Sequence, residues 1–145
     1  MNEREVAVKI KLVSTIFPTE GEKEAYEMWL QGSFVKKAGN SYLRYEEIQE
    51  DLTIRTTIRL EEERAVILRS GAVKMRLVLN TKERENGHYE SPYGSLPLET
   101  RTNELVMENN EDSKINGRFL TRYDLIIGGN SAGKYTLEIN YSEVN

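Results

Sequence analysis

Residues 52–60 decide the fold class, and they read Leu52-Thr53-Ile54-Arg55-Thr56-Thr57-Ile58-Arg59-Leu60. Every second residue, starting at Leu52, is apolar or threonine, whereas the residues between them are threonine or arginine. Successive side chains of a β-strand point to opposite faces of the sheet. The period of two therefore predicts a strand with one face on a core and the other face toward water.

The same period recurs along most of the chain, which predicts a protein built from strands. Turn chemistry separates the runs, because glycine and asparagine adopt a positive φ at little cost. Such turns are predicted at residues 38–40, 70–72, 86–87, 116–117 and 128–130, with Asn86-Gly87 as the strongest hairpin signal. The further alternating faces are Val6, Val8, Ile10, Leu12; Val73, Met75, Leu77, Leu79; Phe119, Thr121, Tyr123, Leu125, Ile127; and Tyr135, Leu137, Ile139, Tyr141.

Two segments leave room for a different interpretation. Residues 18–30 could form a helix capped by Thr19, but the alternation of the apolar side chains favours a loop over residues 17–21 and then a strand to about Lys37. Residues 108–114 are strongly polar and predict a long hairpin loop.

These strands, about eight to ten in number, are joined by short connections, which favours an up-and-down antiparallel order. A sheet of that length normally curls, splits or closes, and closure removes the exposed edges. We therefore expect an all-β fold, a closed antiparallel barrel of about eight main strands. It should form one domain over residues 1–145, because no linker or repeat interrupts the chain.

Composition excludes several classes of function. The 145 residues contain no cysteine and one histidine, His88, so thiolate chemistry and a site with several histidines are impossible within one chain. A net charge of -4 provides no global basic field for nucleic acid or an anionic membrane. The start of the chain, Met1 to Glu5, shows no apolar leader, and no stretch is long and apolar enough to span a membrane. We expect a cytoplasmic protein without a cofactor.

Residues 128–134, Gly-Gly-Asn-Ser-Ala-Gly-Lys, match the spacing of a phosphate-binding P-loop. A P-loop needs serine or threonine next, to hold Mg²⁺, and a helix whose first amides face the phosphate. Position 135 is tyrosine, and the residues after it alternate like a strand. The match therefore predicts a hairpin loop and no nucleotide site.

Two stretches, Tyr42-Leu43-Arg44-Tyr45-Glu46-Glu47 and residues 88–100 (His-Tyr-Glu-Ser-Pro-Tyr-Gly-Ser-Leu-Pro-Leu-Glu-Thr), resemble the YwiB-like family of small bacterial β-barrel proteins. With the order of the strands around them, the resemblance covers most of the chain. It implies a lipocalin-like, calycin-type barrel and supplies no catalytic residues. The Gly-x-Trp signature of true lipocalins is absent, because Met28 and Leu30 flank Trp29.

A closed barrel of this size offers its interior or its mouth to one small molecule. A buried arginine needs a carboxylate or an anionic ligand as its partner, and a histidine beside tyrosines could form a polar mouth. Glu46 and Glu47 are adjacent and point to opposite faces, so they cannot form a carboxylate pair. The candidate ligand-binding residues are Tyr42, Arg44, Glu46, Arg69, His88, Tyr89 and Tyr93.

Other functions stay open at this point. The alternative is a barrel filled by side chains that acts through its surface or a homodimer interface, for which Leu120 and Ile126 are candidates. Arg55 and Arg59 make one basic strand face, but acidic residues elsewhere favour a mixed, solvated exterior over nucleic-acid binding. An enzyme is the weakest interpretation, because no nucleophile, base and orienting group stand together. The expected partner is a small molecule, and the chain is expected as a monomer or homodimer.

Overall fold

A computed structural model describes residues 4–144, which form ten strands and no helix. The predicted domain runs from residue 1 to residue 145, and positions 1–3 and 145 lie outside the described residues. The predicted absence of an apolar leader, made on Met1 to Glu5, also falls partly on these positions. Ten is the upper end of the predicted range. The strands are β1 (Arg4–Pro18), β2 (Glu24–Lys37), β3 (Asn40–Gln49), β4 (Leu52–Leu60), β5 (Arg64–Gly71), β6 (Lys74–Asn80), β7 (Glu85–Ser91), β8 (Gly94–Asn110), β9 (Asn116–Ile127) and β10 (Asn130–Glu143).

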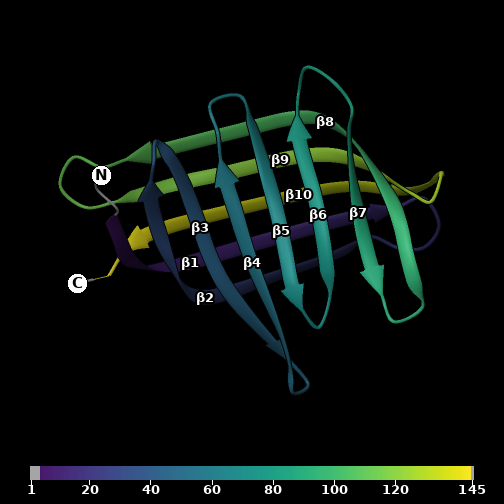
Figure 1. Cartoon of the computed structure of the whole chain (residues 1–145), viewed down its shortest axis with the longest axis horizontal. Helices are drawn as coiled ribbons and strands as arrows, with labels where there is room; N and C mark the ends of the chain where they lie inside the picture. Colours follow the sequence, from purple (N-terminus) through teal and green to yellow (C-terminus); the bar gives the residue numbers. More distant parts are fainter. Residues whose placement is uncertain (1–3, 145) are drawn as a thin grey trace.

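Every strand pairs antiparallel with its neighbours in the sequence, and β1 pairs with β10 to close the barrel. The predicted up-and-down order is therefore confirmed. In Figure 1, β3 to β7 cross in front of β1, β2, β9 and β10 at a steep angle, and the long β8 bends from one layer into the other. Two layers that cross in this way can pack tightly at one corner and separate at the opposite end.

The segment with two interpretations is a strand, because β2 begins at Glu24 and pairs with β1 from Glu24 to Lys36. The helical alternative for residues 18–30 is wrong. The predicted loop at 108–114 is shorter than expected, since β8 continues to Asn110. The turn at Ala38-Gly39 is confirmed, and both residues have a positive φ, at 52° and 83°, as a tight hairpin requires.

Two predicted turns are wrong. Asn86-Gly87 lies inside β7 and Asn116-Gly117 lies at the start of β9. These glycines permit close approach of a neighbouring chain instead of a positive φ. A Cβ on Gly87 would lie 1.9 Å from the Arg76 carbonyl oxygen, and one on Gly117 would lie 2.3 Å from the Tyr141 hydroxyl.

The seam between β6 and β7 is short, with only three registered residue pairs. Beyond it, the second half of β6 is held to β8 by threonine side chains. The Thr100 hydroxyl donates to the Val78 carbonyl oxygen at 2.5 Å, and Thr102 Oγ1 accepts from the Asn80 amide at 3.0 Å. Side-chain hydrogen bonds thus replace backbone pairing at this part of the barrel wall.

Thr102→Val is expected to lower the free energy of unfolding by about 1–3 kcal/mol, because it leaves the partly buried Asn80 amide without an acceptor. Chemical denaturation measures the loss, and amide hydrogen exchange at Asn80 should become faster. Thr136→Val is the control, since no hydrogen bond joins the Thr136 side chain to another residue within 4–144. Equal stability of the two variants, with unchanged exchange at Asn80, would show that the threonine is not part of the seam.

One half of the barrel is filled by side chains. Phe34 and Tyr141 stack there at 5.6 Å between ring centroids, and Phe119 is completely buried beside them in the core. Ile115, from the loop before β9, is also fully buried. Its backbone is fixed by a bond from its amide to the Glu143 carboxylate at 2.9 Å and one from the Glu143 amide to its carbonyl at 2.7 Å. The packed side chains fill this half of the barrel.

Candidate ligand cavity

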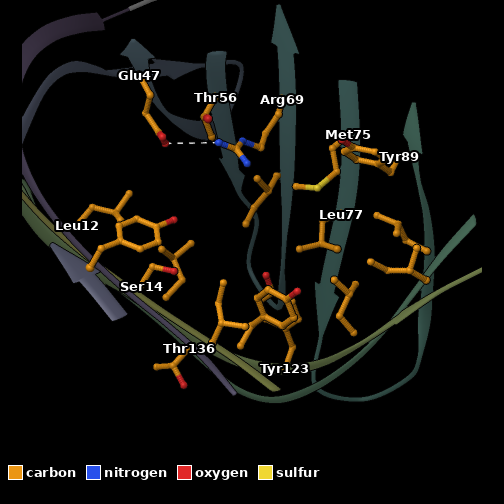
Figure 2. Close-up of a pocket in the computed structure, with 18 of the residues that line it drawn as sticks. Leu12, Ser14, Glu47, Thr56, Arg69, Met75, Leu77, Tyr89, Tyr123 and Thr136 are labelled. Carbon is orange, nitrogen blue, oxygen red and sulfur yellow. Dashed lines mark ion pairs between the residues drawn. The ribbon is translucent and has the colours of Figure 1, made fainter. Parts of the chain in front are cut away.

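The other half of the barrel is hollow, with a cavity of about 340 Å³. It lies where β1, β3, β5, β7 and β9 end and where their partner strands begin. Small-molecule pockets have volumes of about 300–1,000 Å³, so the space suits one small molecule. Figure 2 shows Glu47, Thr56 and Arg69 along one wall and Ser14 and Tyr123 on the opposite side.

The walls next to the filled half are apolar. Leu77 on β6 and Leu98 on β8 face the cavity, and Leu79, two residues along from Leu77, belongs to the packed core. Alternation along each strand explains the arrangement. Every second residue of a strand points into the barrel, so successive inward side chains lie at successive depths between the filled half and the open end. The inner wall is therefore apolar, and the polar groups lie toward the mouth.

Five tyrosines line the cavity: Tyr26, Tyr45, Tyr89, Tyr123 and Tyr135. Tyr123 and Tyr135 stack, with ring centroids 5.3 Å apart. Burial raises the pKa of Tyr45, with a smaller contribution from the Glu47 charge, and burial raises the pKa of Tyr123 and of Tyr135. The three hydroxyls are thus held neutral, as hydrogen-bond donors and acceptors on apolar rings.

Alkaline pH is expected to destabilise the barrel. The unfolded chain can ionise these tyrosines near pH 10, whereas the folded chain resists ionisation; burial also raises the pKa of Tyr141 in the core to about 12. The contribution of the buried, neutral tyrosines to the free energy of unfolding is therefore fully present below pH 10, and it decreases as the pH rises above 10. An absorbance titration of phenolate, followed together with circular dichroism, should show that the last tyrosines ionise only as the barrel unfolds. Complete ionisation of a barrel that keeps its folded spectrum would contradict this expectation.

An ion pair crosses the cavity wall. The Glu47 carboxylate on β3 and the Arg69 guanidinium on β5 are 3.5 Å apart, and their side chains are 7% and 28% exposed. Glu47 also accepts a hydrogen bond from Gln49 at 3.3 Å. No hydrogen bond joins the Arg69 guanidinium to another residue within 4–144, so most of its five donors are free to bind a ligand.

A second polar group faces the same space. Thr56 Oγ1 is buried, and no hydrogen bond of good geometry joins it to a described residue, although the Tyr45 hydroxyl lies close enough to interact with it. A buried hydroxyl without a partner costs about 1–3 kcal/mol. Its cost, together with the free donors of Arg69, is consistent with a site that is completed by a polar ligand.

The structure brings together only two of the predicted site residues, Arg69 and Tyr89, which both line the cavity. The other five lie outside the lining of this cavity. Tyr42, Arg44 and Glu46 lie on the outer face of β3, where Arg44 stacks on the Tyr42 ring at 5.8 Å and Glu46 pairs with Arg55 at 3.0 Å. His88 points outward from β7, and Tyr93 is 98% exposed in the turn that follows.

Sequence reasoning missed Glu47, Thr56 and Ser14 as cavity residues. Each is a polar side chain that interrupts an otherwise apolar alternating face, as Thr56 does between Ile54 and Ile58. That interruption was the available signal, because a polar residue on a core face requires a partner or a function.

The arrangement suits noncovalent binding. The cavity offers hydroxyls, one cation and one anion around apolar walls. No group of three histidine, aspartate or glutamate side chains within residues 4–144 could hold a metal ion. Residues 4–144 also contain no helix that is long and apolar enough to cross a membrane.

Comparison with known proteins identifies relatives of this chain. It is 26% identical, over 129 residues and 89% of each chain, to the uncharacterised β-barrel protein YwiB from Bacillus subtilis (strain 168). The crystal structure of the Bacillus subtilis ywiB protein superposes with a TM-score of 0.83, over 97% of this chain and 94% of that one. The model of a family described as a domain of unknown function, DUF1934, matches residues 10–139. The protein belongs to the DUF1934 family.

Proposed function

We propose that this protein binds one small amphipathic molecule in the hollow half of its barrel. The observation that carries the proposal is the cavity of about 340 Å³, whose inner wall is apolar and whose outer part holds Thr56, together with the ion pair of Glu47 and Arg69. A ligand with an apolar part and a polar head would satisfy both regions at once.

The barrel itself supports a binding role. An up-and-down barrel that is packed at one end and hollow at the other is consistent with the lipocalin-like grouping that the sequence resemblance implies, which we extend to this chain as part of the proposal. The absence of cysteine is consistent with action in the cytoplasm. We assign no chemical step to the site, because binding needs none.

Native mass spectrometry of gently purified protein, compared with its denatured mass, tests the proposal. We expect extra mass on the native protein that leaves on denaturation, and the identity of that mass names the ligand. A bare native mass that also gains nothing after incubation with a metabolite extract would contradict the proposal.

The second candidate is self-association at the mouth of the barrel. Exposed large apolar side chains gather there: Phe17, Tyr26, Ile48, Leu52, Tyr93 and Leu96. The same end carries Glu20, Glu22 and Glu24, and two such rims would repel each other, which places this function second. Leu120, proposed for an interface, is buried. Light scattering at low and high salt measures dimer formation, and a monomer at both would exclude it.

A further inference from the structure

The Glu47–Arg69 pair differs from the other ion pairs of the barrel because it faces an enclosed space. Most of the other pairs lie on the outer surface, as Lys82 with Glu63 does, with side chains 68% and 65% exposed. Glu47 is 7% exposed, and Arg69 reaches it at one atom pair 3.5 Å apart. Charges that are largely withdrawn from water need further partners to offset the loss of hydration.

The charge of the pair limits which ligand can provide those partners. A purely anionic head would bind Arg69 but would be repelled by Glu47 beside it. A purely cationic head would bind Glu47 but would be repelled by Arg69. At a few ångströms in a poorly hydrated site, each repulsion is comparable in size to the attraction. A head with one positive and one negative group pairs with both residues and adds no net charge.

The surroundings of Glu47 also favour a cation on its side of the pair. Tyr26 and Tyr45 both line the cavity with Glu47, and Tyr45 lies two residues before Glu47 on the same face of β3. Aromatic faces attract an ammonium group. On the inner side, Leu77 and Leu98 provide an apolar wall for a side chain.

We propose that the ligand is a small zwitterion with an apolar side chain, of the chemical class of a free amino acid. Its ammonium group lies against Glu47, its carboxylate against Arg69, and its side chain toward Leu77 and Leu98. The inference deepens the proposed function and rests on it, since it assigns the head group of the molecule that the cavity binds.

Isothermal titration calorimetry with three matched compounds tests the head group. L-phenylalanine carries both charges, 3-phenylpropanoate lacks the ammonium group, and 2-phenylethylamine lacks the carboxylate. We expect L-phenylalanine to bind at least about tenfold more tightly than either analogue, because each lost charge-assisted hydrogen bond is worth about 1.5–3 kcal/mol and 1.4 kcal/mol is a factor of ten. Equal or tighter binding of either analogue would overturn the assignment.

Two variants locate each charge. Glu47→Gln should remove the preference for L-phenylalanine over 3-phenylpropanoate, and Arg69→Gln should remove its preference over 2-phenylethylamine. If a residue has a merely structural role, its substitution should weaken the binding of all three compounds alike. That result would overturn the assignment of that contact. Thermal unfolding checks that each variant is folded. If a variant does not fold, the affinities of the unmodified protein for the three compounds still test the assignment.

A neutral probe separates this inference from the proposed function. N-phenyl-1-naphthylamine carries no charge and fluoresces more strongly in an apolar site. If it binds while none of the three phenyl compounds does, the zwitterion is wrong and the cavity still binds ligands. If neither the probe nor the three compounds bind, both proposals fail.

Discussion

Leu79→Ala is expected to lower the free energy of unfolding by about 3–5 kcal/mol, the range typical of leucines in packed cores. Leu79 is completely buried in the filled half of the barrel, in the same core cluster as Leu43, Ile58 and Phe119. Deleting its side-chain atoms removes their contacts and leaves a cavity that neighbours on rigid paired strands cannot fill. Urea unfolding followed by circular dichroism measures the change.

Leu77→Ala is the matched comparison, on the same strand and the same face. Leu77 is 1% exposed but borders the cavity, so fewer neighbours lose contacts when it is shortened. We expect a loss at or below about 3 kcal/mol, the lower end of the leucine range. A greater loss for Leu77→Ala than for Leu79→Ala would contradict the division of the barrel into a filled and a hollow half.

Gly133→Ala is expected to destabilise the protein by about 3 kcal/mol or more, from backbone strain together with overpacking. Gly133 has a φ of 137°, which alanine rarely adopts, and it lies at the bulge where β10 shifts register against β9. A Cβ at this position would lie 2.4 Å from the Phe17 carbonyl oxygen. That contact is with backbone, so no side chain can move aside. Thermal and urea unfolding measure the effect.

Gly129→Ala provides the control in the same hairpin. Gly129 has a φ of 86°, but a Cβ there would meet nothing within 4 Å, so only the conformational cost of about 1–2 kcal/mol applies. Equal losses for the two variants would contradict the close packing of Gly133 on β1. This packing also explains Gly133, the last glycine of the P-loop-like stretch, because it allows β10 and β1 to approach closely.

Most of the fold could be predicted from the sequence because the strands alternate so regularly. In residues 52–60, the alternation names Ile54, Thr56 and Ile58 as inward, and β4 confirms them as buried, whereas Leu52 at the start of the strand is 57% exposed. The two wrong turns came from glycine. Gly87 and Gly117 looked like turn residues, but a glycine that permits a positive φ and one that permits close approach are identical in sequence.

The site could be predicted only in part, because alternation does not say which face of a mixed strand is inside. In β3 both faces carry charge and tyrosine: Tyr42, Arg44 and Glu46 on one, and Leu43, Tyr45 and Glu47 on the other. The register with β2 and β4 decides the matter, by placing Leu43 opposite Phe34 and Ile58 in the core. That information depends on pairing between strands, and a single strand does not contain it.

The most direct test of the central claim is a fluorescence titration of N-phenyl-1-naphthylamine into three proteins. Ser14→Phe directs a ring into the cavity, whereas Thr15→Phe places the same ring on the outer face of β1. The account predicts saturable binding to the unmodified protein and to Thr15→Phe, and binding to Ser14→Phe that is lost or weakened at least about tenfold, a change of 1.4 kcal/mol. Equal binding to all three folded proteins, or none to the unmodified protein, would contradict a ligand-binding cavity inside the barrel.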